Sequence, residues 1–215
     1  MSQVYELLPS PRRMAVIGLG AGTISAYAQK DDQLVYYEID PDNEKIAREW
    51  FTYLKECKGS IRVIEGDGRL SMQARKAGKM KYDVITIDAF SGDGIPTHLL
   101  TREAISVYLD RLGENGIILF HISNRYYDLR PVLKSTASTL GLFGAMNELG
   151  KKNKAKAPYV NEQWVALAVD SRRLRPLIDR GWRAIGKGDG LKDMAPWTDD
   201  YINVLAACRI RDKFF

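Results

Sequence analysis

The sequence contains little cysteine and no long hydrophobic run. Only Cys57 and Cys208 occur among its 215 residues, and they form no paired motif. This scarcity argues against a disulfide framework or a zinc site and is typical of proteins in a reducing cytoplasm. No stretch approaches the ~20 apolar residues of a membrane helix, and residues 1–13 lack the apolar segment of a signal peptide. We therefore expect a cytoplasmic protein with no bound metal and no membrane segment.

Positive charge is in only slight excess. The formal net charge is +5, from 32 Lys and Arg against 27 Asp and Glu, and Lys151–Lys156 alone supplies four positive charges. No aromatic residue interrupts this run, as a base-stacking platform would require. The run is interpreted as a solvated loop, and the sequence argues against a nucleic-acid partner.

Short apolar runs alternate with amphipathic stretches up to Gly141. The runs predict strands at 14–17, 34–39, 61–64, 82–87 and 116–121, and the stretches predict helices at 23–29, 41–57, 69–77, 99–112 and 129–140. This alternation predicts an α/β fold with a Rossmann-like, doubly wound, mostly parallel sheet. Residues 142–149 and 164–169 predict an antiparallel hairpin at one edge of the sheet, and 1–215 is interpreted as a single domain.

Glycines punctuate the turn after the first predicted strand, in Gly18-Leu19-Gly20-Ala21-Gly22. Glycine permits a tight turn and lets a ligand approach the backbone without a Cβ in the way. A dinucleotide fingerprint would have its third glycine at position 23, where this chain has Thr23. The shorter spacing is the form seen in S-adenosylmethionine-dependent enzymes. Gly18, Gly20 and Gly22 are predicted to contact a nucleoside, although an ordinary strand-to-helix turn would use the same residues.

Acidic residues follow the next two predicted strands. Glu38 stands twenty residues after Gly18, where a carboxylate can accept hydrogen bonds from both ribose hydroxyls. Asp67 could accept from the adenine amino group, or it could cap the helix that follows. Asp40 is interpreted mainly as a helix cap. With Gly68, these residues predict a nucleoside site at the carboxyl edge of the sheet.

Two aspartates follow the fourth predicted strand. Asp88 can take a proton from an incoming amine or hold an ammonium group, and Asp93 can assist or bind a second positive charge. A glycine-rich turn with two solvated aspartates is the plainer alternative. Asp88 and Asp93 are the predicted catalytic residues, because a cationic acceptor needs fixed negative partners.

Polar and aromatic residues further along the chain are candidates for binding the acceptor. These candidates are His121, Asn124, Tyr126, Asp199 and Asp200. His121 could equally be a structural histidine, and the cluster Trp197–Tyr201 could be a turn and helix cap. The sequence leaves both alternatives open.

Several of these segments together resemble spermidine synthase, and most closely the bacterial spermidine synthase-like proteins that are often fused to a transporter-like membrane region. The segments are 37–40, 66–68, 82–101, 116–119, 121–126 and 197–201. The resemblance implies the fold of class I methyltransferases and aminopropyl transfer from decarboxylated S-adenosylmethionine to a small amine. It implies that Glu38 holds the ribose, that Asp67 holds the adenine, and that Asp88 deprotonates the attacking amine.

Three features depart from the spermidine synthase pattern. Ala21 stands where these enzymes usually carry an aspartate that resembles a partner for the donor's amine. Ser91 stands where they have a second acceptor-loop aspartate, and Asp93 is displaced from it by two residues. They also have an N-terminal β domain that supplies a tyrosine and helps to build the diamine pocket. That domain is expected to be absent here or supplied by another chain.

Three functions are compatible with this pattern. The first is a spermidine synthase-like transferase, with S-adenosylmethionine or its decarboxylated form as donor substrate. The second, favoured by Ala21, is an S-adenosylmethionine-dependent methyltransferase acting on a small molecule. The third is a non-catalytic nucleoside-binding domain, against which Asp88 argues. The expected partners are a small amine or another small-molecule acceptor and, in a homodimer, a second copy of the chain.

Overall fold

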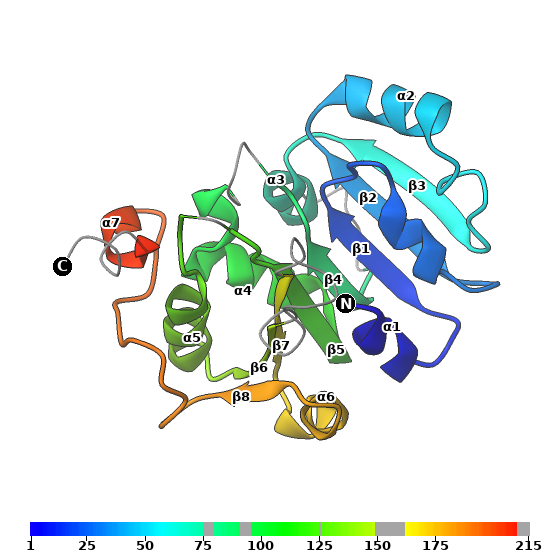
Figure 1. Ribbon diagram of the computed structural model, residues 1–215. Coiled ribbons are helices and arrows are strands. Elements are labelled where there is room, and N and C mark those ends of the chain that lie inside the picture. Colours follow the sequence, from blue (N-terminus) through cyan, green and yellow to red (C-terminus); the bar gives the residue numbers. More distant parts are fainter. Residues whose placement is uncertain (75–79, 91–95, 125, 149–161, 210–215) are drawn as a thin grey trace, which may run out of the picture. The chain divides into compact units, whose positions relative to one another are not determined.

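The computed structural model describes residues 1–74, 80–90, 96–124, 126–148 and 162–209 (Figure 1). The chain divides into two compact units. The first comprises Met1–Ala89 and Val107–Ile118, and the second comprises Phe90–Ser106 and Leu119–Phe215. The basic run at 151–156 lies outside the described residues.

A parallel sheet forms the core of the first unit. Strand β1 (Arg13–Ile17) pairs with β2 (Gln33–Glu38) on one side and with β4 (Tyr82–Ile87) on the other. Strand β3 (Ser60–Glu65) pairs with the outer side of β2 (Figure 1). Most residues of β1, β2 and β4 are buried, because a parallel strand covered on both faces needs a nearly continuous apolar run.

The helical segments of the first unit are short. They are α1 (Ser2–Leu7), the 3₁₀ turn η1 (Thr23–Tyr27), α2 (Pro41–Trp50) and α3 (Gly68–Gln73). Two further elements, α4 (Arg102–Arg111) and β5 (Leu112–His121), each contribute residues to both units.

Three predicted helices in this unit are wrong in type or length. The helix predicted over 69–77 ends at Gln73, where Ala74 leaves the helical conformation. The segment predicted as a helix over 23–29 is only a 3₁₀ turn, because the Asp32 carboxylate accepts the Gln29 backbone N–H at 2.8 Å and Ala28 is extended. The helix predicted to reach about residue 57 ends at Trp50, where Phe51 adopts an extended conformation. The aromatic and β-branched residues from Trp50 to Tyr53 have weak helix propensity.

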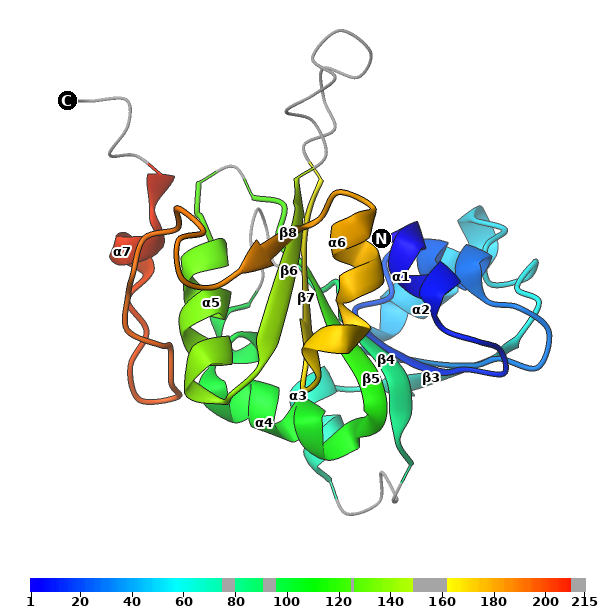
Figure 2. The same ribbon diagram turned by 90° about the horizontal axis from the view of Figure 1, so that it is seen from below.

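The second unit contains the predicted antiparallel hairpin. Strand β6 (Phe143–Glu148) pairs with β7 (Gln163–Ala168), as expected. However, β8 (Arg183–Ile185) pairs with the other side of β6 (Figure 2), so the hairpin is not itself the edge. Strand β8 could not be predicted from the sequence, since it has three residues and none of them is buried.

The helices of the second unit are also short, apart from α5. They are η3 (Thr97–Leu99), α5 (Arg130–Thr139), η4 (Ser171–Arg173), α6 (Arg175–Asp179) and α7 (Val204–Ala207). Gly141 has a positive φ of 67° and ends the α5 segment as predicted. No helix in the described ranges combines the length and apolar character required to span a bilayer.

The eight described strands have the order β3-β2-β1-β4-β5-β7-β6-β8, parallel at one end and antiparallel at the other. This order confirms the predicted Rossmann-like α/β class. The chain proceeds from β1 outward to β3 and then returns to β4 on the other side of β1. The topological switch point, where such folds bind ligands, therefore lies between the carboxyl ends of β1 and β4.

A buried ion pair holds in place the residue that precedes β1. Arg12 and Asp32 have side chains that are 1% and 0% exposed, and Arg12 Nε donates to Asp32 Oδ2 at 2.9 Å. The guanidinium also donates to the carbonyl oxygens of Tyr5 and Tyr27, so it holds α1 and η1 together. Burial alone would raise the pKa of Asp32, but hydrogen bonds from Arg12 and Ser10 outweigh it and hold the pKa below its ordinary value.

We predict that Asp32→Asn lowers the free energy of unfolding by about 3–5 kcal/mol at neutral pH, because it leaves Arg12 buried without its counter-charge. The depressed pKa stabilises the fold above the unfolded-state pKa, and this contribution is lost as the pH falls through the folded-state pKa. The mutant should therefore lose part of the wild-type dependence of stability on acid pH. Urea denaturation from pH 3 to 7 measures both effects. Asp179→Asn, which breaks an exposed pair with Arg175, is the control and should change stability little.

Candidate functional site

The carboxyl ends of four parallel strands are joined directly beyond the sheet. Three backbone hydrogen bonds make the connections: Gly18 N to Tyr37 O (2.9 Å), Asp88 N to Ile17 O (2.9 Å) and Gly66 N to Glu38 O (2.8 Å). The turn after each strand is thereby fixed to its neighbour. The glycine loop, Glu38, the Asp67 turn and Asp88 consequently belong to one continuous edge at the switch point.

Gly18 is required by its surroundings as well as by its conformation. Its φ is +96°, and a Cβ added there would lie 2.6 Å from the carbonyl oxygen of Asp88. Gly20 and Gly22 also have positive φ. At Gly18 the glycine loop therefore packs against the chain that follows β4 more closely than any side chain would allow.

Glu38 is the central polar residue of this edge. Its side chain is largely buried, and the residue is 7% exposed. Its Oε2 accepts hydrogen bonds from Leu19 N (2.8 Å) and Asn43 Nδ2 (3.0 Å), and its Oε1 accepts from Asp40 N (2.9 Å). The carboxylate is thus a satisfied buried charge, held by donors from the glycine loop, the end of β2 and the first turn of α2.

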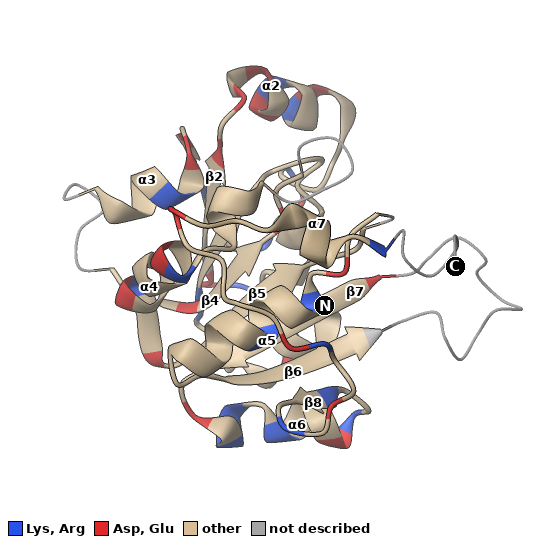
Figure 3. Ribbon diagram, turned by 90° about the vertical axis from the view of Figure 1, so that its left-hand side faces the viewer, with Lys and Arg blue, Asp and Glu red and all other residues tan. Residues whose placement is uncertain are grey.

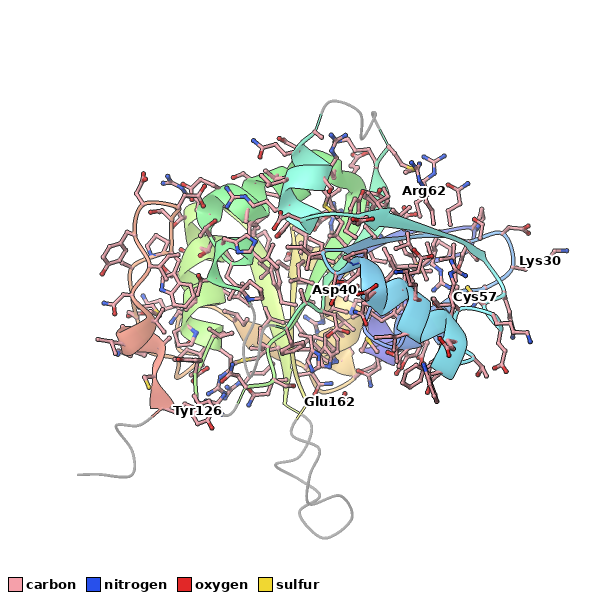
Figure 4. The ribbon with its side chains drawn as sticks, turned by 90° about the horizontal axis from the view of Figure 1, so that it is seen from above. Lys30, Asp40, Cys57, Arg62, Tyr126 and Glu162 are labelled. Carbon is pink, nitrogen blue, oxygen red and sulfur yellow. The ribbon has the colours of Figure 1, made fainter. Side chains whose placement is uncertain are left out.

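Asp40 and Asp67 both cap helices. Asp40 lies at the start of α2 (Figure 4), where its Oδ1 accepts from Asp42 N at 3.0 Å, which confirms the predicted cap. Asp67 Oδ1 accepts from Leu70 N at 2.8 Å at the start of α3, so the capping alternative also holds. Contact between Asp67 and an adenine stays a prediction.

Gly68 has a packing role that the sequence did not indicate. A Cβ on this residue would lie 2.7 Å from Ile17 Cγ2. The start of α3 therefore sits directly on β1, and the absence of a side chain at Gly68 is explained by that contact without any ligand.

Two exposed apolar residues accompany the carboxylates, and neither was predicted from the sequence as part of the site. Ile39 follows Glu38 and is 69% exposed, and Leu70 lies in the first turn of α3 and is 64% exposed. Large apolar side chains left in water beside buried polar groups are typical of ligand-binding surfaces. The only indication in the sequence was their position, next to Glu38 in one case and three residues after Asp67 in the other.

Asp88 follows β4 and is partly exposed. Burial raises the pKa of Tyr5 and of Tyr36, and the negative charge of Asp88 contributes to both shifts. Tyr5 is hydrogen-bonded to Thr86 Oγ1 at 2.7 Å. These tyrosines therefore stay neutral at ordinary pH. Asp93, the other predicted catalytic residue, lies outside the described residues.

His121, in the second unit, has a structural environment. Its ring stacks on Trp164 with centroids 4.1 Å apart, and Phe90 meets it edge-on at 5.1 Å. Its Nε2 lies 2.8 Å from Ser123 Oγ, which also accepts the backbone N–H of Gln163. These contacts support the structural alternative for His121.

Asn124 and Tyr126 lie in the turn that follows β5. Asn124 Oδ1 accepts from the backbone N–H groups of Tyr126 (2.7 Å) and Tyr127 (2.9 Å), so this side chain shapes the turn. The side chain of Tyr126 is exposed (Figure 4). Their predicted role in acceptor binding stays a prediction.

The cluster Trp197–Tyr201 forms a turn attached to the start of α4. Asp199 Oδ1 accepts from Thr101 Oγ1 at 2.8 Å, and Asp199 N donates to Glu103 Oε2 at 3.0 Å. The turn-and-cap alternative therefore describes Asp199, while Asp200 is exposed. Within the described residues, no group of three or more His, Cys, Asp and Glu side chains is arranged to hold a metal ion.

Comparison with solved structures places the fold in the class I methyltransferase type. Human Methyltransferase-like protein 13, solved in complex with SAH, matches with a TM-score of 0.61 and 16% identity over 94% of each chain. A probable spermidine synthase from Corynebacterium glutamicum ATCC 13032 matches with a TM-score of 0.57 and 17% identity, over 89% of this chain and 75% of that one. A spermidine synthase in complex with the transition-state analogue AdoDATO has a TM-score of 0.52 and 16% identity, over 95% and 67%.

Sequence comparison adds two relatives. A polyamine aminopropyltransferase from Vibrio vulnificus (strain CMCP6) is 34% identical over 125 residues, which are 56% of this chain and 41% of that protein. An eEF1A lysine and N-terminal methyltransferase from Bos taurus is 27% identical over 90 residues, 40% of this chain and 13% of that protein. The chain thus spans less than half the length of these relatives, and no protein-family model matches it. In sequence the chain is similar to a polyamine aminopropyltransferase over part of its length, and its fold is of the class I methyltransferase type.

We predict that Gly18→Ala lowers the free energy of unfolding by about 2–4 kcal/mol, from the strained positive φ together with the overlap with the Asp88 carbonyl. Thermal or urea denaturation measures the change. Gly186→Ala is the matched control, because a Cβ there meets no atom within 4 Å and the backbone needs no positive φ. Equal stability of the two variants would contradict the close packing of the glycine loop on the chain after β4.

Proposed function

We propose that the first unit binds the adenosine part of an S-adenosyl sulfonium donor and that the protein is a spermidine synthase-like aminopropyltransferase. Decarboxylated S-adenosylmethionine would be the donor and a small amine the acceptor. The observation that carries the proposal is the buried carboxylate of Glu38, held against the glycine loop at the switch point. The similarity to a polyamine aminopropyltransferase supports the choice of donor.

The surroundings of Glu38 suit a nucleoside. A carboxylate offers about four acceptor positions, and the exposed side chains of Ile39 and Leu70 provide apolar surface for a purine ring. Two of the structurally similar proteins were solved with SAH and with AdoDATO. We expect Gly18, Gly20 and Gly22 to face the same ligand through their backbone, and Asp67 to lie near its adenine.

Asp88 would be the base in this reaction. The amine nitrogen attacks the aminopropyl carbon bound to sulfur, so a C–N bond forms while the C–S bond breaks. The sulfur keeps the electron pair and methylthioadenosine leaves. The Asp88 carboxylate takes the proton from the attacking nitrogen. Its backbone bond to Ile17 fixes it at the switch point, beside the glycine loop.

Methyl transfer from S-adenosylmethionine to a small molecule is the second candidate function. Ala21 supports it, because this side chain gives the donor's amine no carboxylate partner. The match over 94% of each chain to a methyltransferase-like protein also supports it, although 16% identity shows only the fold. The nucleoside site would be the same in both cases, and only the transferred group would differ.

Thermal shift with three ligands separates these functions. Decarboxylated S-adenosylmethionine and methylthioadenosine are expected to raise the melting temperature, since a ligand that binds the native state stabilises it. A clear preference for S-adenosylmethionine itself would contradict the aminopropyltransferase proposal and support methyl transfer. If none of the three ligands raises the melting temperature, the nucleoside proposal is wrong.

We predict that Asp88→Asn lowers turnover by about 10²–10⁴ because the amide cannot accept the proton. Binding of methylthioadenosine should be largely unchanged. Single-turnover assays with the identified donor and calorimetry with methylthioadenosine measure the two effects. Asp110→Asn, on the exposed face of α4, is the control and should keep full activity. Full activity of Asp88→Asn would refute its role as the base.

A further inference from the structure

The first turn of α2 directs one amide side chain toward Glu38. Asn43 Nδ2 donates to Glu38 Oε2 at 3.0 Å, and the residue is half-buried. Its neighbours on both sides behave differently. Asp42 pairs with Lys45 and Glu44 pairs with Arg48, within the exposed charges of both signs on α2 (Figure 3).

Asn43 differs in kind from the other donors recorded for Glu38. Leu19 and Asp40 donate through backbone N–H groups, whose positions are set by the glycine loop and the start of α2. The Asn43 donor is the end of a side chain that can rotate. Of these three hydrogen bonds, the one from Asn43 is therefore the one that an incoming ligand can replace without moving the backbone.

A ribose needs such a replaceable bond. Its two vicinal hydroxyls each bring one donor, while Glu38 has about four acceptor positions and three of them are filled. One hydroxyl can use the remaining position, and the second must displace the Asn43 amide. A hydroxyl is both donor and acceptor, so it can enter between the two groups, donating to Glu38 Oε2 and accepting from Asn43 Nδ2.

We infer that Asn43 is a specificity residue of the ribose subsite, and that its amide donates to the same ribose hydroxyl that donates to Glu38. This inference rests on the proposed function, since it requires a nucleoside at Glu38. It predicts that the site discriminates against deoxynucleosides. A nucleoside that lacks this hydroxyl forms neither bond and leaves the hydrogen bond between Asn43 and Glu38 as it is in the free protein.

The test compares methylthioadenosine with its 2′-deoxy and 3′-deoxy analogues, titrated by calorimetry into the wild type and into Asn43→Leu. Leucine has a similar size and good helix propensity but no donor. The wild type should bind one deoxy analogue at least tenfold more weakly than methylthioadenosine. In Asn43→Leu, binding of methylthioadenosine should weaken, because its hydroxyl loses the Asn43 donor, while that deoxy analogue should keep its affinity. The discrimination should therefore be reduced, and the part that remains comes from the hydroxyl that still donates to Glu38.

Other outcomes separate this inference from the proposed function. Equal weakening of all three ligands in Asn43→Leu would mean that Asn43 only holds Glu38 in place. Unchanged discrimination would likewise overturn the inference while the nucleoside site stands. A wild type that binds none of the ligands would overturn both proposals. Asn43→Ala is the second variant if Asn43→Leu does not fold. Glu44→Gln, at a side chain that pairs with Arg48 on the same helix, should bind all three ligands as the wild type does.

Discussion

The buried carboxylate of Glu38 is the interaction on which the rest of the site depends. A charge removed from water is costly unless every part of it is hydrogen-bonded, and Glu38 obtains its donors from three different segments. The position of the glycine loop, the direction of the chain after β2 and the first turn of α2 are thereby coupled to one group.

Close backbone packing supplies the second constraint at the switch point. Gly18 lies against the carbonyl of Asp88, and Gly68 lies against Ile17. Gly18 lets the end of β1 approach the chain that follows β4, and Gly68 lets the start of α3 approach β1. Glu38 and Asp88 therefore belong to the same edge of the sheet, as expected for functional groups carried on a firm scaffold.

Much of this fold could be predicted from the sequence, because buried parallel strands require apolar runs that are easily seen. Strands β1, β2 and β4, the cap at Asp40 and the stop at Gly141 follow from local chemistry. The short length of η1 could not be predicted, since Asp32 is positioned by tertiary contacts with Arg12. The edge strand β8 is too short and too exposed to leave a pattern.

The candidate site was predicted in part. The residue types at Glu38, Asp67 and Asp88 were visible because acidic groups stand directly after apolar strands. The exposure of Ile39 and Leu70 and the orientation of Asn43 were not visible, because they depend on where a strand ends and which face of a helix turns inward. Conversely, two of the predicted acceptor-binding residues have structural hydrogen bonds: Asn124 shapes its own turn, and Asp199 accepts from Thr101 beside the start of α4.

The most direct test of the central claim is calorimetric titration of methylthioadenosine into the wild type and Glu38→Gln. The substitution keeps the size of the side chain and one acceptor oxygen but removes the charge and half of the acceptor capacity. We predict measurable binding to the wild type and binding at least tenfold weaker to Glu38→Gln, with the variant still folded by circular dichroism. Equal affinity of the two proteins would contradict the assignment of Glu38 as the centre of a nucleoside site.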